Sequence, residues 1–249
     1  MDDFAYTLRR DLIRTLGEEG GAELSACDAY VEPFALLARH LWPEGQRFEP
    51  RSVLIDAALL TPLFHLVLAH RGAFEREHLL NYGRLGALVQ PGLDSRRTPG
   101  VRAPLPPSGA GLSFALGWSG AGPVTCVVDE RAFKTATFDE SLSFWDTLPH
   151  RPLTLLLCAY REQSFEALKA RLERLGRRVS SFGPQDALPE SFDEGIYVFY
   201  RQPTFLHLKA STPLTRQVKE ELLEELRLRA GKEEPAQWQM NFSLASQEF

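Results

Sequence analysis

Three residues near the middle of the chain have side chains that could do chemistry. Asp129 and Glu130 end a short apolar stretch, and Lys134 follows Glu130 by four residues. Two carboxylates at the end of a strand could hold Mg²⁺ through oxygen ligands, and the lysine could stabilise charge on a scissile phosphate. This pattern indicates a metal-dependent nuclease or phosphoester-cleaving enzyme. We hold this function as the alternative prediction.

A second set of candidate residues is basic. Arginines occur in a segment rich in proline and glycine, and again in and after a predicted helix near residue 170. Guanidinium groups pair well with phosphate and carboxylate. The net charge of −5 disfavours nucleic acid as a partner, although a local basic patch could still bind it. The residues predicted to bind an anion are Arg96, Arg97, Arg171, Arg174, Arg177 and Arg178.

The sequence carries no motif that would assign a cofactor or a nucleophile. It has no phosphate-binding loop of the G-x-x-x-x-G-K-[ST] type and no G-x-S-x-G turn. Its three cysteines lie far apart and form no C-x-x-C pair, which argues against both a disulfide framework and a structural zinc site. We therefore predict a cytoplasmic protein with no metal and no cofactor, Mg²⁺ entering only under the nuclease alternative.

The end of the chain is unusually apolar for a tail. A disordered segment does not need several large apolar side chains, so residues 232–249 are predicted either to fold back on the core or to dock on a partner. The leading prediction is a non-enzymatic binding or regulatory subunit that acts through protein–protein contacts, with a protein partner or a second copy. The predicted partner-binding residues are Trp238, Met240, Phe242 and Leu244.

Residues 1–90 are dominated by apolar side chains at helical spacing, which predicts a helical N-terminal region. Within it, the stretch 52–70 is predicted to be one buried helix that is broken or kinked at Pro62, because the proline ring cannot donate the helical hydrogen bond. Asp56, His65 and His70 interrupt the apolar content of this stretch, so no membrane association is predicted.

Residues 91–111 are rich in proline and glycine, which predicts a connector, either a linker or a lid. From residue 112 to 249 short apolar segments alternate with helical patterns, as is typical of crossover connections, and the segment ends in a C-terminal helix and the apolar tail. We therefore predict an α+β or α/β fold, with the helical region followed by a mixed, partly parallel sheet with helices. Predicted strands lie at 112–119, 123–130, 151–160 and 177–182, with a hairpin of 195–201 and 204–210.

Overall fold

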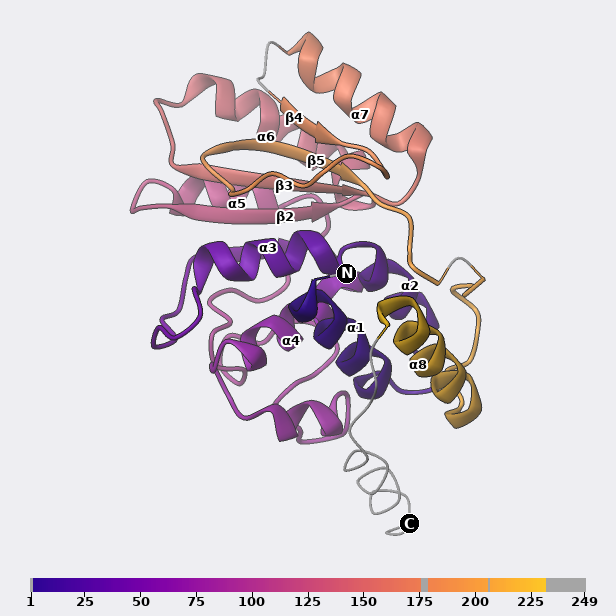
Figure 1. Cartoon of the computed structure of the whole chain (residues 1–249). Helices are drawn as coiled ribbons and strands as arrows, with labels where there is room; N and C mark the ends of the chain where they lie inside the picture. Colours follow the sequence, from indigo (N-terminus) through magenta and orange to yellow (C-terminus); the bar gives the residue numbers. More distant parts are fainter. Residues whose placement is uncertain (1, 176–178, 206, 232–249) are drawn as a thin grey trace.

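A parallel sheet lies at the centre of the chain in this computed structural model, which describes residues 2–175, 179–205 and 207–231 (Figure 1). Its five strands are β1 (Val53–Asp56), β2 (Val124–Asp129), β3 (Leu153–Ala159), β4 (Val179–Phe182) and β5 (Gly195–Tyr200). They lie in the order β1-β2-β3-β5-β4, and every pair is parallel. The prediction of an α/β fold is confirmed, and the described sheet is parallel throughout.

Helices cover both faces of the sheet, which is why the inner strands are apolar along their whole length. Every residue of β2 and β3 is buried. Figure 1 shows α1–α4 and α8 on one side and α5–α7 on the other. The first group is α1 (Asp3–Thr15), α2 (Gly21–Ala29), α3 (Val31–Leu41), α4 (Thr61–His70) and α8 (Arg216–Ala230). The second group is α5 (Gly111–Trp118), α6 (Ala136–Thr147) and α7 (Glu162–Arg174).

The stretch 52–70 is not one helix, so that prediction is wrong. Its first part is β1, and its second part is α4, reached through the short 3₁₀ helix η1 (Ala58–Leu60). Pro62 lies in the first turn of α4, where its missing N–H leaves no helical hydrogen bond unmade. The proline therefore starts a helix here and does not kink one.

Two predicted strands are also absent from the described sheet. Residues 112–119 lie almost wholly in the helix α5, whose start is bound by a carboxylate from β1. The described residues of the range 204–210 do not pair with β5, because β3 and β4 already occupy both edges of that strand. Instead, the backbone N–H of Phe205 donates to the buried carboxylate of Asp28 on α2, at 3.0 Å.

The segment 91–111 forms no regular helix or strand before Gly111, and it passes close to the end of β1. β1, from the predicted helical region, pairs with β2. The division of the chain at residues 90 and 112 stays a prediction. Among the described residues no helix is both long enough and apolar enough to cross a membrane.

Candidate functional site

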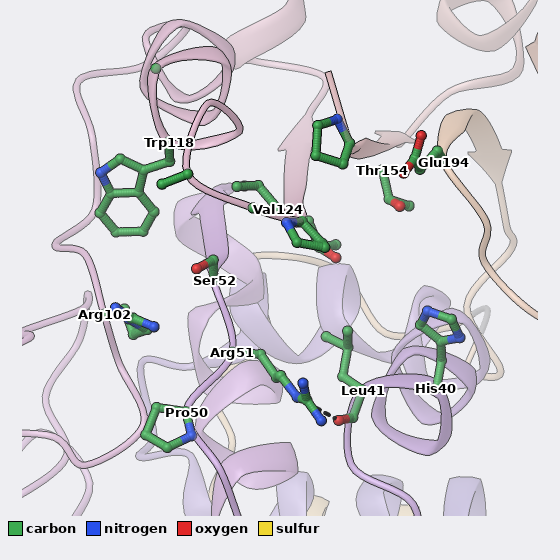
Figure 2. Close-up of a pocket in the computed structure, with 16 residues that line it drawn as sticks. His40, Leu41, Pro50, Arg51, Ser52, Arg102, Trp118, Val124, Thr154 and Glu194 are labelled. Atoms are coloured by element: carbon green, nitrogen blue, oxygen red, sulfur yellow. Dashed lines mark hydrogen bonds between the residues drawn. The ribbon is translucent and has the colours of Figure 1, made fainter. Parts of the chain in front are cut away.

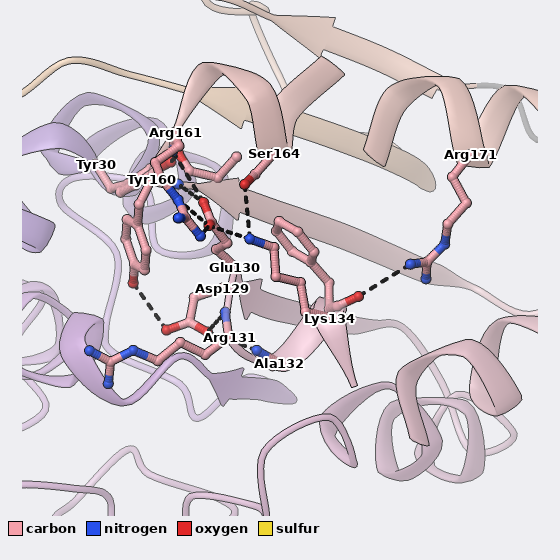
Figure 3. A network of polar contacts seen from close by, with 12 residues as sticks. Tyr30, Asp129, Glu130, Arg131, Ala132, Lys134, Tyr160, Arg161, Ser164 and Arg171 are labelled. Carbon is pink, nitrogen blue, oxygen red and sulfur yellow. Dashed lines mark hydrogen bonds and ion pairs between the residues drawn. The ribbon is translucent and has the colours of Figure 1, made fainter. Parts of the chain in front are cut away.

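Glu130 lies at the centre of a polar cluster at the carboxyl ends of β2 and β3 (Figure 3). Lys134 Nζ donates to Glu130 Oε1 at 2.6 Å and to Ser164 Oγ at 3.0 Å. The backbone N–H groups of Tyr160 and Arg161 donate to Glu130 Oε2 at 2.9 and 3.1 Å, and Arg161 Nε donates to Oε1 at 2.7 Å. Burial opposes ionisation of Glu130, but the bonds from Lys134 and Arg161 outweigh it and lower its pKa to about 2. Glu130 is therefore an ionised anchor for two cations.

Asp129 is also bound on both of its carboxylate oxygens. Oδ1 accepts the backbone N–H groups of Arg131 and Ala132 at 3.0 and 3.1 Å, and Oδ2 accepts the hydroxyl of Tyr160 at 3.0 Å. Burial raises the pKa of Asp129, and these hydrogen bonds oppose that effect. Burial and the neighbouring Asp129 together raise the pKa of Tyr160, so the phenol keeps its proton. The side chain of Asp129 thus holds the turn after β2.

A third carboxylate, Asp56 at the end of β1, was missed by sequence reasoning. Its Oδ2 accepts the backbone N–H groups of Gly109 and Gly111, both at 2.9 Å, at the start of α5. Burial, with a smaller contribution from Asp129, raises the pKa of Asp56 to about 6. The sequence did contain a signal, because the apolar residues 53–55 end in an acid just as the strand before Asp129 does. The longer apolar stretch 52–70, interpreted as one helix, concealed it.

Next to the Glu130 cluster a basic groove runs along α7. This α7 groove has a volume of about 410 Å³ and is lined by Phe133, Lys134, Arg161, Gln163, Ser164, Ala167, Leu168, Arg171 and Arg174. Arg171 forms an ion pair with Asp139 on α6 and lies over the ring of Phe138, with 5.6 Å from its Cζ to the ring centroid. Arg174 Nε donates to the carbonyl of Ala170 at 3.2 Å. The groove presents four cations to solvent.

The structure brings together only part of the predicted site. Arg171 and Arg174 lie in the α7 groove with Lys134, and sequence reasoning missed Arg161, the first residue after the Tyr160 that follows β3. Arg96 and Arg97 lie elsewhere, in the loop after residue 91, where Arg97 donates to the carbonyl of Ala87 at 3.2 Å. Six predicted residues, Arg177, Arg178, Trp238, Met240, Phe242 and Leu244, fall outside the described residues.

A larger cavity opens at the opposite, amino edge of the sheet (Figure 2). This amino-edge pocket has a volume of about 750 Å³, and its lining includes Arg51, Ser52, Arg102, Trp118 and Pro123. Ser52 and Pro123 immediately precede β1 and β2. The pocket is therefore separated from the α7 groove and from the three carboxylates, which lie at the carboxyl ends of the strands.

Comparisons with solved structures place this chain beside transketolases. The transketolase from Leishmania mexicana superposes with a TM-score of 0.66 at 13% identity, covering 92% of this chain and 41% of that one. The Campylobacter jejuni transketolase superposes with a TM-score of 0.61 at 15% identity, covering 93% of this chain and 43% of that one. A Pichia stipitis transketolase in complex with xylulose-5-phosphate superposes with a TM-score of 0.59 at 11% identity, covering 100% of this chain and 47% of that one. Neither family models nor curated proteins gave a match. At these identities the likeness establishes the fold, and this chain spans less than half the length of each transketolase.

These matches correct the functional predictions. The predicted non-enzymatic regulatory subunit and its alternative, a metal-dependent nuclease, are both contradicted, because the solved structures that share this fold are transketolases. The prediction that no cofactor is used is contradicted as well, since transketolase neighbours imply thiamine diphosphate and a divalent metal ion.

The described residues fit only part of that implied cofactor. They contain no group of three or more His, Cys, Asp or Glu side chains that could hold a metal ion. Asp129 and Glu130 direct their oxygens at hydrogen-bond donors of this chain, and so does Oδ2 of Asp56. The donor set in this part of the chain therefore does not fit a metal site, whereas the cations of the α7 groove fit a phosphate group.

Proposed function

We propose that this chain is an enzyme domain that binds a phosphorylated small molecule in the α7 groove. The observation that carries the proposal is the gathering of Lys134, Arg161, Arg171 and Arg174 in one groove beside the carboxyl ends of β2 and β3. Open α/β sheets bind their ligands at that end of the strands. Pichia stipitis transketolases in complex with xylulose-5-phosphate, fructose-6-phosphate and sedoheptulose-7-phosphate support a sugar phosphate as the ligand class.

The groove offers two basic regions for such a ligand. Lys134 and Arg161 lie at the start of α7, both anchored by the buried carboxylate of Glu130. Arg171 and Arg174 lie in the last turn of the same helix. The rise of 1.5 Å per helical residue separates the backbone positions of Arg161 and Arg171 by roughly 15 Å. The Arg171 side chain reaches back along the groove, since its Nη1 donates to the carbonyl of Phe133 at 3.4 Å. A phosphate would bind at the Glu130 end, where the cations are already ordered, and the rest of the molecule would extend toward Arg171.

Isothermal titration calorimetry with fructose-6-phosphate and fructose tests this proposal. We expect the phosphorylated sugar to bind and fructose to bind at least tenfold more weakly, because hydrogen bonds to charged groups contribute about 1.5–3 kcal/mol. Arg161→Gln and Arg171→Gln should each weaken binding of the phosphorylated sugar. The matched control is Arg216→Gln on α8, an exposed arginine paired with Glu220 in the same helix. Equal binding of the two sugars, or equal losses in all three variants, would refute the proposal.

A protein partner or a second copy of this chain remains part of the proposal. Sedimentation velocity tests the homo-oligomer; a monomer up to high micromolar concentration would leave only a different partner. We also retain a cytoplasmic location, which the three buried free thiols, Cys27, Cys126 and Cys158, support.

A further inference from the structure

The amino-edge pocket plays no part in the proposed function, and its lining carries its own chemistry (Figure 2). Its volume of about 750 Å³ lies within the range of small-molecule sites. Part of the wall is apolar and rigid, since Pro50, Pro123 and Pro152 precede the first three strands of the sheet order. Proline has a fixed φ and no N–H to satisfy, so this wall changes little when a ligand enters.

An aromatic side chain faces this pocket without being buried by the fold. Trp118 ends α5, and 36% of its surface is exposed, so part of the indole remains available for contact with a ligand. Figure 2 shows its ring on the same side of the pocket as the Arg102 side chain, with Ser52 near both. An exposed indole face beside a polar hydroxyl is a surface on which a planar ring stacks.

The charges of the pocket favour an anion. Arg51 and Arg102 both line it, and the one carboxylate in its lining, that of Glu194, lies 2.9 Å from Nε2 of His150. Arg51 uses its Nε for the carbonyl of Leu41, at 3.3 Å, which leaves the two terminal nitrogens of its guanidinium group. Arg102 is exposed and makes no hydrogen bond or ion pair with any residue that the structure describes. Guanidinium nitrogens that are not bound by the chain itself can pair with a phosphate or carboxylate.

We propose that the amino-edge pocket is a second ligand site, which binds a small molecule that joins a planar aromatic ring to one anionic group, as a nucleoside monophosphate does. The ring stacks on Trp118, and Arg102 pairs with the anionic group, with Arg51 as the second cation. The site lies at the edge of the sheet opposite the α7 groove, so it can be occupied independently of the ligand proposed for that groove.

Calorimetric titration with three probes tests the pairing of ring and charge. The probes are adenosine monophosphate, adenosine and inorganic phosphate. We expect the monophosphate to bind at least tenfold more tightly than either of the other two, because stacking and charge pairing each contribute to its affinity. If adenosine monophosphate binds no more tightly than inorganic phosphate, the aromatic half of the site does not exist and the proposal is overturned.

Variants then place the binding in the amino-edge pocket. Trp118→Leu and Arg102→Gln should each weaken the binding of adenosine monophosphate about tenfold, and Arg102→Gln changes an exposed side chain whose loss leaves the fold intact. Arg171→Gln, in the α7 groove, and Arg216→Gln, on α8, should leave it unchanged. A loss in Arg171→Gln with no change in Arg102→Gln would assign the nucleotide to the α7 groove and overturn the proposal.

Discussion

A buried histidine provides the sharpest test of how this fold responds to pH. His65 lies on α4 with no exposed surface, and neither ring nitrogen has a hydrogen-bond partner among the described residues. Its ring makes an edge contact with Tyr82, at 6.1 Å between ring centroids. Burial lowers the pKa of His65 from 6.5 to about 4, because a charged imidazolium would lose its hydration without gaining a partner.

The lowered pKa of His65 makes the stability of the folded state depend on pH. Between pH 4 and 6.5 the unfolded chain protonates at His65 and the folded chain does not, so acid favours unfolding in this window. The stability held at neutral pH is complete above pH 6.5, falls as the pH decreases, and stops changing below about pH 4. A shift of this size corresponds to about 3 kcal/mol of unfolding free energy.

Replacing His65 with leucine isolates this contribution. At pH 7.5 the variant should be as stable as the parent or more stable by about 1 kcal/mol, because two unpaired buried nitrogens are removed. At pH 4 its advantage should grow by about 3 kcal/mol, since leucine does not titrate. Urea denaturation at both pH values measures the two differences. The packing change caused by leucine is the same at both pH values, and all other titrating groups are common to both proteins. Both contributions therefore cancel when the two differences are subtracted. An advantage that does not change with pH would show that His65 is not a neutral buried group, and would refute the reasoning.

The carboxylates of the candidate site, and a glycine beside one of them, allow three further predictions. Asp56 has a raised pKa, so the stability it contributes is present below pH 3.8 and is lost as the pH rises through about 6. Asp56→Asn should therefore be more stable than the parent at pH 8 but not at pH 3.5, as urea denaturation would measure. Glu130→Gln leaves two cations without their buried anion and should cost about 3 kcal/mol, whereas Glu220→Gln, which breaks an exposed pair on α8, should cost under about 1 kcal/mol. If thermal unfolding shows equal losses in both, Glu130 is not the anchor. Gly111→Ala places a methyl group 2.5 Å from Asp56 Cβ and should destabilise the fold by about 2 kcal/mol. Gly117→Ala, in the same helix, meets no atom within 4 Å and should stabilise the fold by about 0.5–1 kcal/mol. Similar melting temperatures for the two alanine variants would contradict the packing seen at Asp56.

The elements that local residue patterns specify could be predicted from the sequence. Strands β2 and β3 are unbroken apolar runs bounded by turns, and α7 carries its apolar residues on one face. The last helix ends at Gly231, which adopts the left-handed conformation with φ of 61° that glycine tolerates best. The predicted edge of the sheet at Asp129 and Glu130 is likewise where the structure has it.

The errors arose where a local pattern is compatible with two structures. An apolar run of about ten residues fits a helix or a buried strand equally well, and only packing separates the two. The stretch 52–70 contains both, because Val53, Leu54 and Ile55 pair with β2 across more than sixty residues of intervening chain. The helix α5, which occupies most of the segment 112–119, begins at Gly111, whose N–H donates to Asp56 on β1. Neither fact can be read from residues near the segment itself.

The candidate site divides in the same way. Residue types alone determined that Asp129, Glu130, Lys134, Arg171 and Arg174 are charged groups near the ends of elements, and that was enough to select them. Their roles depend on neighbours that are distant in sequence. Arg161 and Tyr160, which follow β3, donate to Glu130 and Asp129, so two carboxylates that resemble metal ligands are in fact bound by the chain's own donors. Local sequence specifies the periodicity and charge of each segment, whereas the partner of each buried polar group is specified by which strand ends meet at the edge of the sheet.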